Sequence, residues 1–172
     1  LLENTKSFQK KFPLIRVLPI CHDFTDLEKI NYKMNKTKNV IGFFPGSTIG
    51  NFSPKDANKL LKDISIFLKR DNFFLIGVDL IKDQKKIEDA YNDSLGVTAK
   101  FNLNILDRMN REFDAKFTKD YFKHTAFYNK SKNRIEMHLE SLKNQKINIL
   151  GTSISFKKGE TIHTENSYKY SI

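Results

Sequence analysis

The sequence offers little material for metal or redox chemistry. Its 172 residues include one cysteine, Cys21, so no disulfide can form within the chain and no thiolate zinc site can be assembled. The four histidines, His22, His124, His138 and His163, lie in unrelated segments and show no metal-ligand spacing. We therefore expect no metal, and we interpret the histidines as structural or solvent-exposed residues.

Long apolar stretches are also missing. No run reaches the roughly 18 residues that a transmembrane helix requires. The first residues, LLENTKSFQKKFP, resemble neither a signal peptide nor an Arg-rich transit sequence. These absences predict a cytoplasmic protein with no membrane partner.

Charge is abundant but dispersed. The chain has 30 Lys and Arg against 20 Asp and Glu, a net charge of +10, which is the kind of excess that nucleic-acid-binding proteins carry. Lysines alternate with acids, however, as in KDQKKIEDAYND, so we expect no nucleic-acid partner. The 39% hydrophobic residues, with 15 Phe among them, are enough to fill the core of a globular protein, which we expect to be a monomer.

The first half of the chain reads as part of a parallel α/β sheet. Residues 40–44 form an apolar run that ends at Pro-Gly, and residues 73–80, FFLIGVDL, form a second run typical of a strand covered on both faces. Between them, Ser53, Pro54 and Asp56 precede a helical apolar stripe, which predicts a helix over residues 54–70. Strand, helix and strand in this order predict one crossover unit. Residues 14–20 predict an earlier strand, with a helix before it.

The second half has a different pattern. Apolar residues at helical spacing over residues 84–111, interrupted at Gly96, predict two helices. From Phe122 the period becomes two, around a KSKN turn, which predicts an antiparallel hairpin, and residues 146–156 predict a further strand. The expected fold class is therefore α/β: a broken parallel sheet in residues 1–81 and a small α+β domain in residues 82–172.

The segment FFPGSTIGNF, residues 43–52, leaves the end of a predicted parallel strand, where ligands bind in open α/β sheets. Gly46 lets the backbone approach a ligand, and the Asn51 carboxamide offers both a donor and an acceptor, which suits an amino acid. The alternative is a tight turn in which Asn51 or Ser53 caps the next helix. The segment contains neither Gly-Lys-Ser/Thr nor a complete GxGxxG, so it is no phosphate loop.

Two other polar segments are weaker candidates. In CHDFTD, Asp23 could accept from the exocyclic amine of an adenine while Phe24 packs against the base. The alternative is that Asp23 lies in a surface turn and Phe24 packs into the core. In the ending GETIHTENSYKY, Glu165 and Ser167 could accept from and donate to the two nitrogens of an imidazole if the segment is a loop. The alternative for this ending is a helix-capping segment.

Five segments, in one order along almost the whole chain, resemble the histidine-specific N-methyltransferase family that makes hercynine for ergothioneine biosynthesis. They are FFPGSTIGNF, FFLIGVDLIKD, EDAYNDSLGVTAKFNLNIL, RIEMHL and GETIHTENSYKY. The resemblance implies a Rossmann-like methyltransferase domain that ends near Ile81, followed by a substrate-binding domain. It also implies transfer of methyl groups from S-adenosylmethionine, the co-substrate, to the α-amine of L-histidine.

The resemblance assigns roles to individual residues. Asn51 and Tyr91 match the positions that hold the amino and carboxylate groups of histidine, and are our candidate catalytic residues, with the Gly46 backbone close by. Glu165 and Ser167 match the pair that binds the imidazole. Further matches are Asn166 between that pair, Thr98 and Met137 in the substrate pocket, and Asp23 and Phe24 at the adenosine part of the cofactor.

The sequence departs from the family pattern at its front. The family's substrate-domain segment with an active-site tyrosine, its Gly-rich first βα loop and its acidic ribose-binding residue are not found, and CHDF replaces the usual small residue before Asp-Phe. We therefore expect the chain to be a fragment of a longer protein. Two other functions stay open: methylation of another amino acid, such as a prenylated tryptophan, and a non-catalytic binding module. Glu165 and Met137 argue against tryptophan, because a carboxylate suits imidazole better than indole.

Overall fold

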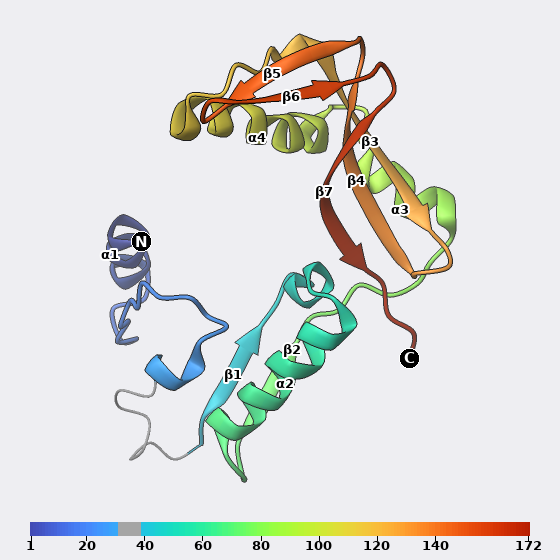
Figure 1. Cartoon of the computed structure of the whole chain (residues 1–172). Helices are drawn as coiled ribbons and strands as arrows, with labels where there is room; N and C mark the ends of the chain where they lie inside the picture. The colour runs from blue at the N-terminus through green and yellow to red at the C-terminus, as the bar shows by residue number, and fades with distance from the viewer. Residues whose placement is uncertain (31–38) are drawn as a thin grey trace. The chain divides into compact units, whose positions relative to one another are not determined.

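The computed structural model describes residues 1–30 and 39–172, which form two compact units. The first unit comprises Leu1–Phe43 and Asn58–Leu75, and the second comprises Phe44–Ala57 and Ile76–Ile172. The elements mix helices and strands along the chain, so the fold is α/β (Figure 1). The functional boundary near Ile81 stays a prediction.

The front of the chain differs from the expected strand. Helix α1 (Leu2–Lys11) is the predicted helix, and a short 3-10 turn, η1 (Leu27–Ile30), follows later. Residues 14–20, however, form no strand, and the Leu14 side chain is 99% exposed. Pro13 precedes this run and Pro19 lies within it, neither can donate a backbone N–H to a sheet, and no strand of the described residues pairs with the run. The prediction of a strand here is wrong for this structure.

The predicted crossover unit is confirmed in β1 (Ile41–Phe44), α2 (Pro54–Leu68) and β2 (Phe73–Ile76). Backbone bonds from Phe73 N–H to the Val40 carbonyl and from Gly77 N–H to the Phe44 carbonyl advance in the same direction on both strands, so the strands are parallel. Both strands alternate between exposed and half-buried residues. Within the described residues one face of the pair is therefore open, contrary to the expected cover on both faces.

The two predicted helices after this unit are α3 (Gln84–Tyr91) and α4 (Val97–Phe113). The Asp83 side chain caps α3 by accepting from Lys86 N–H. Gly96, with φ +65°, makes the break before α4, as the sequence predicts. The Asp93 carboxylate then accepts from the Val97 and Thr98 N–H groups and caps the start of α4.

The remaining strands form an antiparallel sheet and a separate hairpin. The predicted hairpin is β3 (Phe122–Asn129) and β4 (Arg134–Ser141), preceded by the short η4 (Lys119–Tyr121), and β7 (Thr161–Tyr168) joins it in the order β3-β4-β7. Two expectations are wrong. Residues 146–156 contain two strands, β5 (Gln145–Ile149) and β6 (Thr152–Phe156), because Leu150 and Gly151 both adopt positive φ and turn the chain. The ending is a strand instead of a loop or helix cap, since it pairs with β4 over its length.

Two buried clusters hold the second unit together. One joins α4 to the strands through Leu106, Phe122 and Leu139, with Phe156 of β6 packed against them. The other joins α3 to β3 and β4 through Ile87, Ala126 and Met137, and the half-buried Tyr91 ring packs against it. The second cluster therefore anchors the end of α3 that carries Tyr91.

Candidate functional site

The candidate site is a concave surface of about 610 Å³, which is in the size range of small-molecule sites. It lies wholly within the second unit, where the chain leaves the carboxyl ends of β1 and β2, as expected for an open parallel sheet. Helix α3 and strand β7 supply the other side. The lining residues are Gly46, Ser47, Thr48, Asn51, Gly77, Val78, Asp79, Tyr91, Glu165, Ser167 and Lys169.

The loop after β1 is held by the loop after β2. Gly46 has φ +74° and Ser47 has φ +58°, so the chain turns sharply into the 3-10 helix η3 (Thr48–Asn51). The Asp79 N–H donates to Ser47 Oγ at 2.8 Å. The Asn51 side chain is exposed at the end of η3 and makes no hydrogen bond to another described residue, so its carboxamide is available to a ligand.

Gly50 lets η3 approach β7, and Figure 1 shows the end of β7 beside this loop. A Cβ atom at Gly50 would lie 2.9 Å from the Tyr168 carbonyl oxygen and 3.6 Å from Ser167 Oγ. The 2.9 Å contact with the backbone oxygen is too close for any larger residue unless the backbone shifts. The Tyr170 hydroxyl adds a bond to the Ile49 carbonyl at 3.3 Å. The missing side chain at Gly50 therefore allows Asn51 and Ser167 to line one cavity.

A β-bulge in β7 decides which side chains face the site. Met137 pairs with Glu165, but the next residue, His138, pairs with His163, so Thr164 is the extra residue of the bulge. Glu165 therefore shares a face with Ser167, whereas His163 shares the opposite face with His138. The Thr164 hydroxyl closes the bulge by donating to the Met137 carbonyl at 2.9 Å.

A hydrogen-bonded group of three side chains forms the floor of the site. The Tyr91 hydroxyl donates to Ser167 Oγ at 2.7 Å, and Lys169 Nζ lies 2.9 Å from both oxygens. Lys169 also pairs with Asp79 Oδ2 at 2.9 Å. Partial burial works to raise the pKa of Asp79, but hydrogen bonds from Lys82 and Lys169 outweigh it and hold the pKa below its ordinary value. Sequence reasoning missed Lys169, although the period of two from Glu165 through Ser167 would have placed it on the same face.

The Glu165 side chain differs from the other charged groups of the site, Asp79 and Lys169, which pair with each other. Its carboxylate is half-buried and makes no hydrogen bond or ion pair with the other described residues. Burial alone raises the pKa of Glu165 above its ordinary value. A carboxylate in a cavity with a perturbed pKa and no partner is typical of a group that receives a donor from a ligand.

The remaining predicted substrate residues do not line the cavity. Met137 is 3% exposed and belongs to the core, where its pairing with Glu165 makes it a neighbour of the site. Asn166 pairs with Glu136, so its side chain is on the opposite face of β7 from Glu165 and Ser167. Thr98 lies in the first turn of α4, where its N–H is bonded to Asp93.

Tyr91 is positioned through its backbone as well as its hydroxyl. His124 Nε2 lies 2.9 Å from the Tyr91 carbonyl oxygen, and His124 Nδ1 lies 3.0 Å from Asn102 Nδ2. The Asn102 amide donates, so His124 Nδ1 must accept and Nε2 carries the proton. His124 is structural, as the sequence suggests, and it fixes the end of α3.

The predicted adenosine pair belongs to the first unit. Asp23 and Phe24 are exposed, and Asp23 Oδ1 accepts from the Thr25 N–H at 2.9 Å and from the Thr25 hydroxyl at 2.7 Å. These two bonds hold the pKa of Asp23 below its ordinary value. The local geometry is thus a surface turn, and the cofactor role of the pair stays a prediction.

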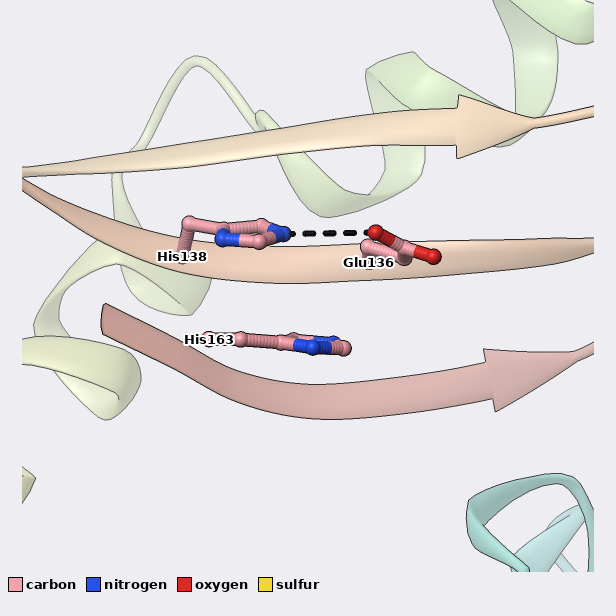
Figure 2. Close-up of side chains that lie close together, drawn as sticks. All are labelled: Glu136, His138 and His163. Carbon is pink, nitrogen blue, oxygen red and sulfur yellow. Dashed lines mark ion pairs between the residues drawn. The ribbon is translucent and has the colours of Figure 1, made fainter. Parts of the chain in front are cut away.

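One group of described residues, Glu136, His138 and His163, could offer three ligand atoms to a cation, all within 4.8 Å of one another (Figure 2). Glu136 Oε1, however, is paired with Arg134 at 2.5 Å. The two imidazoles stack at 4.5 Å with an interplanar angle of 11°. Because each nitrogen lone pair lies in its ring plane, nearly parallel rings do not direct their lone pairs to one point. We interpret this group as an ion pair with stacked rings.

The sequence pattern of the family described as "Histidine-specific methyltransferase, SAM-dependent" matches residues 1–172. The chain belongs to this family. The resemblance inferred from the five segments is therefore confirmed.

The chain is also similar to individual curated proteins. The chain is 36% identical over 163 residues to "Histidine N-alpha-methyltransferase" of Mycolicibacterium smegmatis, covering 93% of this chain and 50% of that protein. It is 39% identical over 88 residues to "Ergothioneine biosynthesis protein 1" of Neurospora crassa, covering 51% of the chain and 10% of that protein. It is also 31% identical over 130 residues to "L-tryptophan methyltransferase trpM" of Psilocybe serbica, covering 74% of the chain and 36% of that protein. The chain thus spans half the length of its mycobacterial relative.

Among the described residues, no helix has the length and apolar character needed to cross a bilayer.

Proposed function

We propose that the complete gene product containing this chain transfers methyl groups from S-adenosylmethionine to the α-amine of L-histidine, giving trimethylhistidine (hercynine) for ergothioneine biosynthesis. The observation that carries the proposal is the half-buried Glu165 carboxylate, unpartnered among the described residues, beside Ser167. In a histidine-specific family, such a carboxylate suits the N–H of an imidazole. The crossover unit β1-α2-β2 supports a Rossmann-like methyltransferase sheet.

The cavity has two chemically different ends for the substrate. Glu165 and Ser167 offer an acceptor and a hydroxyl to the imidazole. Asn51 offers a free carboxamide to the amino and carboxylate groups, and the Tyr91 oxygen lies on the same cavity. Binding histidine at both ends would fix the direction in which its α-amine points.

Alignment is the main catalytic contribution that these residues can make. S-adenosylmethionine supplies a methyl group on a sulfonium, and the amine displaces it in line. Holding the nucleophile near attack geometry lowers the activation barrier by several kcal/mol, and in favourable cases by about 7 kcal/mol or more. We assign this alignment to Asn51 and Tyr91, and Asp23 and Phe24 are the residues of this chain proposed for the adenosine part.

The attacking amine must be neutral, whereas an amino acid is mostly an ammonium near neutral pH. Desolvation in the cavity favours loss of this proton, and the Tyr91 hydroxyl and the Asn51 carboxamide oxygen are proposed groups that can accept an N–H hydrogen bond. After three transfers the product is a quaternary ammonium, which has no N–H but can rest against an aromatic face.

Methylation of tryptophan is the second candidate, favoured by the similarity to the Psilocybe protein. An indole has one N–H and no ring acceptor, so it would leave the Ser167 hydroxyl hydrogen without an acceptor on the ring and would place a large apolar ring against the Glu165 carboxylate. Imidazole satisfies both groups. The site therefore favours histidine.

Product analysis tests the proposed function. The complete gene product is incubated with S-adenosylmethionine and L-histidine, and mass spectrometry follows the gain of one, two and three methyl groups. We expect the trimethylated betaine as the end product, and a strongly reduced rate for Asn51→Ala under the same conditions. Absence of any methylated histidine from active, folded protein would refute the proposal.

A further inference from the structure

Lys169 is the most deeply buried charge at the site. Its side chain is 1% exposed. Its ammonium has three N–H donors and three acceptors within 2.9 Å, namely Tyr91 Oη, Ser167 Oγ and Asp79 Oδ2. The ammonium also lies 4.8 Å from the centre of the Tyr91 ring. Burying a lysine is costly unless every N–H is satisfied, and here each one is.

This arrangement determines the direction of every hydrogen bond in the group. Lysine can only donate, so Ser167 Oγ accepts from Lys169. Of the two hydroxyls 2.7 Å apart, the phenol is the more acidic, so Tyr91 donates and Ser167 accepts again. Both acceptor positions of Ser167 Oγ are then occupied. Its own hydrogen has to point elsewhere, and the cavity that Ser167 lines is the open direction.

We propose that Lys169 is a positioning residue that makes Ser167 an obligate hydrogen-bond donor to the substrate ring. This inference rests on the proposed function, because it concerns the histidine imidazole at the same site. A Ser167 that only donates requires an unprotonated ring nitrogen, while the Glu165 carboxylate requires an N–H. The pocket therefore binds one neutral tautomer of the imidazole, and it rejects rings that lack an acceptor nitrogen.

The alternative is that Lys169 only stabilises the local structure through its ion pair with Asp79. Three variants separate the two roles. Lys169→Met removes the donor and the charge, whereas Lys169→Arg keeps both. Asp79→Asn removes the ion pair but leaves the lysine donors facing Tyr91 and Ser167. Lys169→Gln is a second test that keeps a polar group in the cavity, and its carbonyl oxygen could accept from Ser167 and reverse that hydroxyl.

The deciding readout is the tautomer of bound histidine. The complete gene product is saturated with ring-¹⁵N histidine and demethylated cofactor, and ¹⁵N NMR distinguishes protonated from unprotonated ring nitrogens. We expect one nitrogen of each kind in the wild type, in Lys169→Arg and in Asp79→Asn. In Lys169→Met and Lys169→Gln, Ser167 can also accept from the ring, so the nitrogen facing Ser167 should shift toward the protonated value while the nitrogen facing the Glu165 carboxylate stays protonated. The Michaelis constant for histidine should rise roughly five- to tenfold in these two variants, as expected for one lost hydrogen bond.

The outcomes separate this inference from the proposed function. If the wild type neither binds nor methylates histidine, the proposed function fails. If the wild type methylates histidine but either Lys169→Met or Lys169→Gln, folded by circular dichroism, keeps the wild-type ¹⁵N pattern, the role of Lys169 is refuted. The same change of the ¹⁵N pattern in Asp79→Asn would also refute it, because loss of the ion pair alone would then explain the effect.

Discussion

We assign Glu165 and Asn51 to opposite ends of the bound substrate, so their removal should affect different kinetic constants. Glu165→Ala would leave an imidazole N–H without its charged acceptor, a loss of about 1.5–3 kcal/mol, or roughly ten- to hundredfold in histidine binding. The reaction occurs at the other end of the substrate, so we expect saturating histidine to restore much of the turnover.

Asn51→Ala is the matched comparison. It loosens the amine itself, so the maximal rate should fall even at saturation, because alignment is lost. Steady-state kinetics of both variants of the complete gene product measures the difference. An unchanged Michaelis constant for Glu165→Ala, or a full maximal rate for Asn51→Ala, would mean that the two ends are wrongly assigned.

Glu165 should also lower the stability of the free protein at neutral pH. Its pKa is raised by burial, so in the folded state the charged form is disfavoured relative to the unfolded chain. Below the ordinary pKa of 4.5 the carboxyl is protonated in both states and costs nothing. As pH rises through the raised pKa, stability is lost. We expect Glu165→Gln to unfold at a higher temperature than the wild type at pH 7, with the difference vanishing at pH 4; a difference independent of pH would contradict this account.

Single residues were unequally predictable from the sequence. Asn51 and Tyr91 stand in recognisable segments, and the structure brings them to one cavity with Glu165 and Ser167. Lys169 was missed because the ending was interpreted as a loop, where no period of two applies. The opposite orientation of Asn166 was missed for the same reason. The bulge at Thr164 depends on the register between β4 and β7, which a single strand cannot reveal.

At the scale of elements, the approach of η3 to β7 is the contact on which the site depends. Gly50→Ala would place a Cβ 2.9 Å from the Tyr168 carbonyl oxygen, so the two elements must move apart. We expect a loss of about 1–3 kcal/mol in the free energy of unfolding. Histidine binding should weaken as well, because Asn51 and Ser167 separate.

Gly151→Ala is the control for Gly50→Ala. Gly151 has φ +78° in the β5–β6 turn, with open space around its Cβ position, so alanine there adds backbone strain away from the site. Urea unfolding and histidine titration should show lower stability for both variants but weaker binding for Gly50→Ala alone. Unchanged binding in Gly50→Ala would show that this contact does not shape the site.

The start of α4 depends on the charge of Asp93. Hydrogen bonds from the Thr98 and Val97 N–H groups lower the pKa of Asp93 to about 2 from its ordinary 3.8. The stabilisation of the folded state by the charged Asp93 carboxylate is therefore complete above pH 3.8 and is lost as the pH falls toward about 2. We expect Asp93→Asn to unfold more easily than the wild type at pH 7, with the gap narrowing below pH 3.8.

Asp89→Asn is the control for Asp93→Asn. Among the described residues, Asp89 forms an exposed ion pair with Lys85 alone, which should contribute little to stability. Urea unfolding at pH 7 and pH 3 compares the variants, and a constant gap between Asp93→Asn and the wild type would argue against a charge effect.

Elements defined by local signals were the most predictable. Ser53 and Pro54 gave the start of α2, and Gly96 gave the break between α3 and α4. The strand expected at residues 14–20 was wrong because an apolar run forms a strand only where another strand pairs with it, and none of the described residues does so. The turn at Leu150 and Gly151 was missed because Leu150 carries no turn signal, despite its φ of +48°.

At the scale of the whole molecule, the fold class follows from the order of the elements, whereas the substrate does not. Family membership was predictable because five segments kept one order along the chain, and the family match spans residues 1–172. The choice between histidine and tryptophan depends on two polar side chains, Glu165 and Ser167, in one cavity. That choice is the central claim of the proposed function.

A competition assay tests this claim most directly. The complete gene product receives equal concentrations of L-histidine, L-tryptophan and L-tyrosine with limiting S-adenosylmethionine, and mass spectrometry measures every methylated product over time. We predict that methyl groups appear almost entirely on histidine and accumulate as the trimethylated betaine, with tryptophan and tyrosine nearly untouched. Methylation of tryptophan at an efficiency comparable to that of histidine would contradict the account.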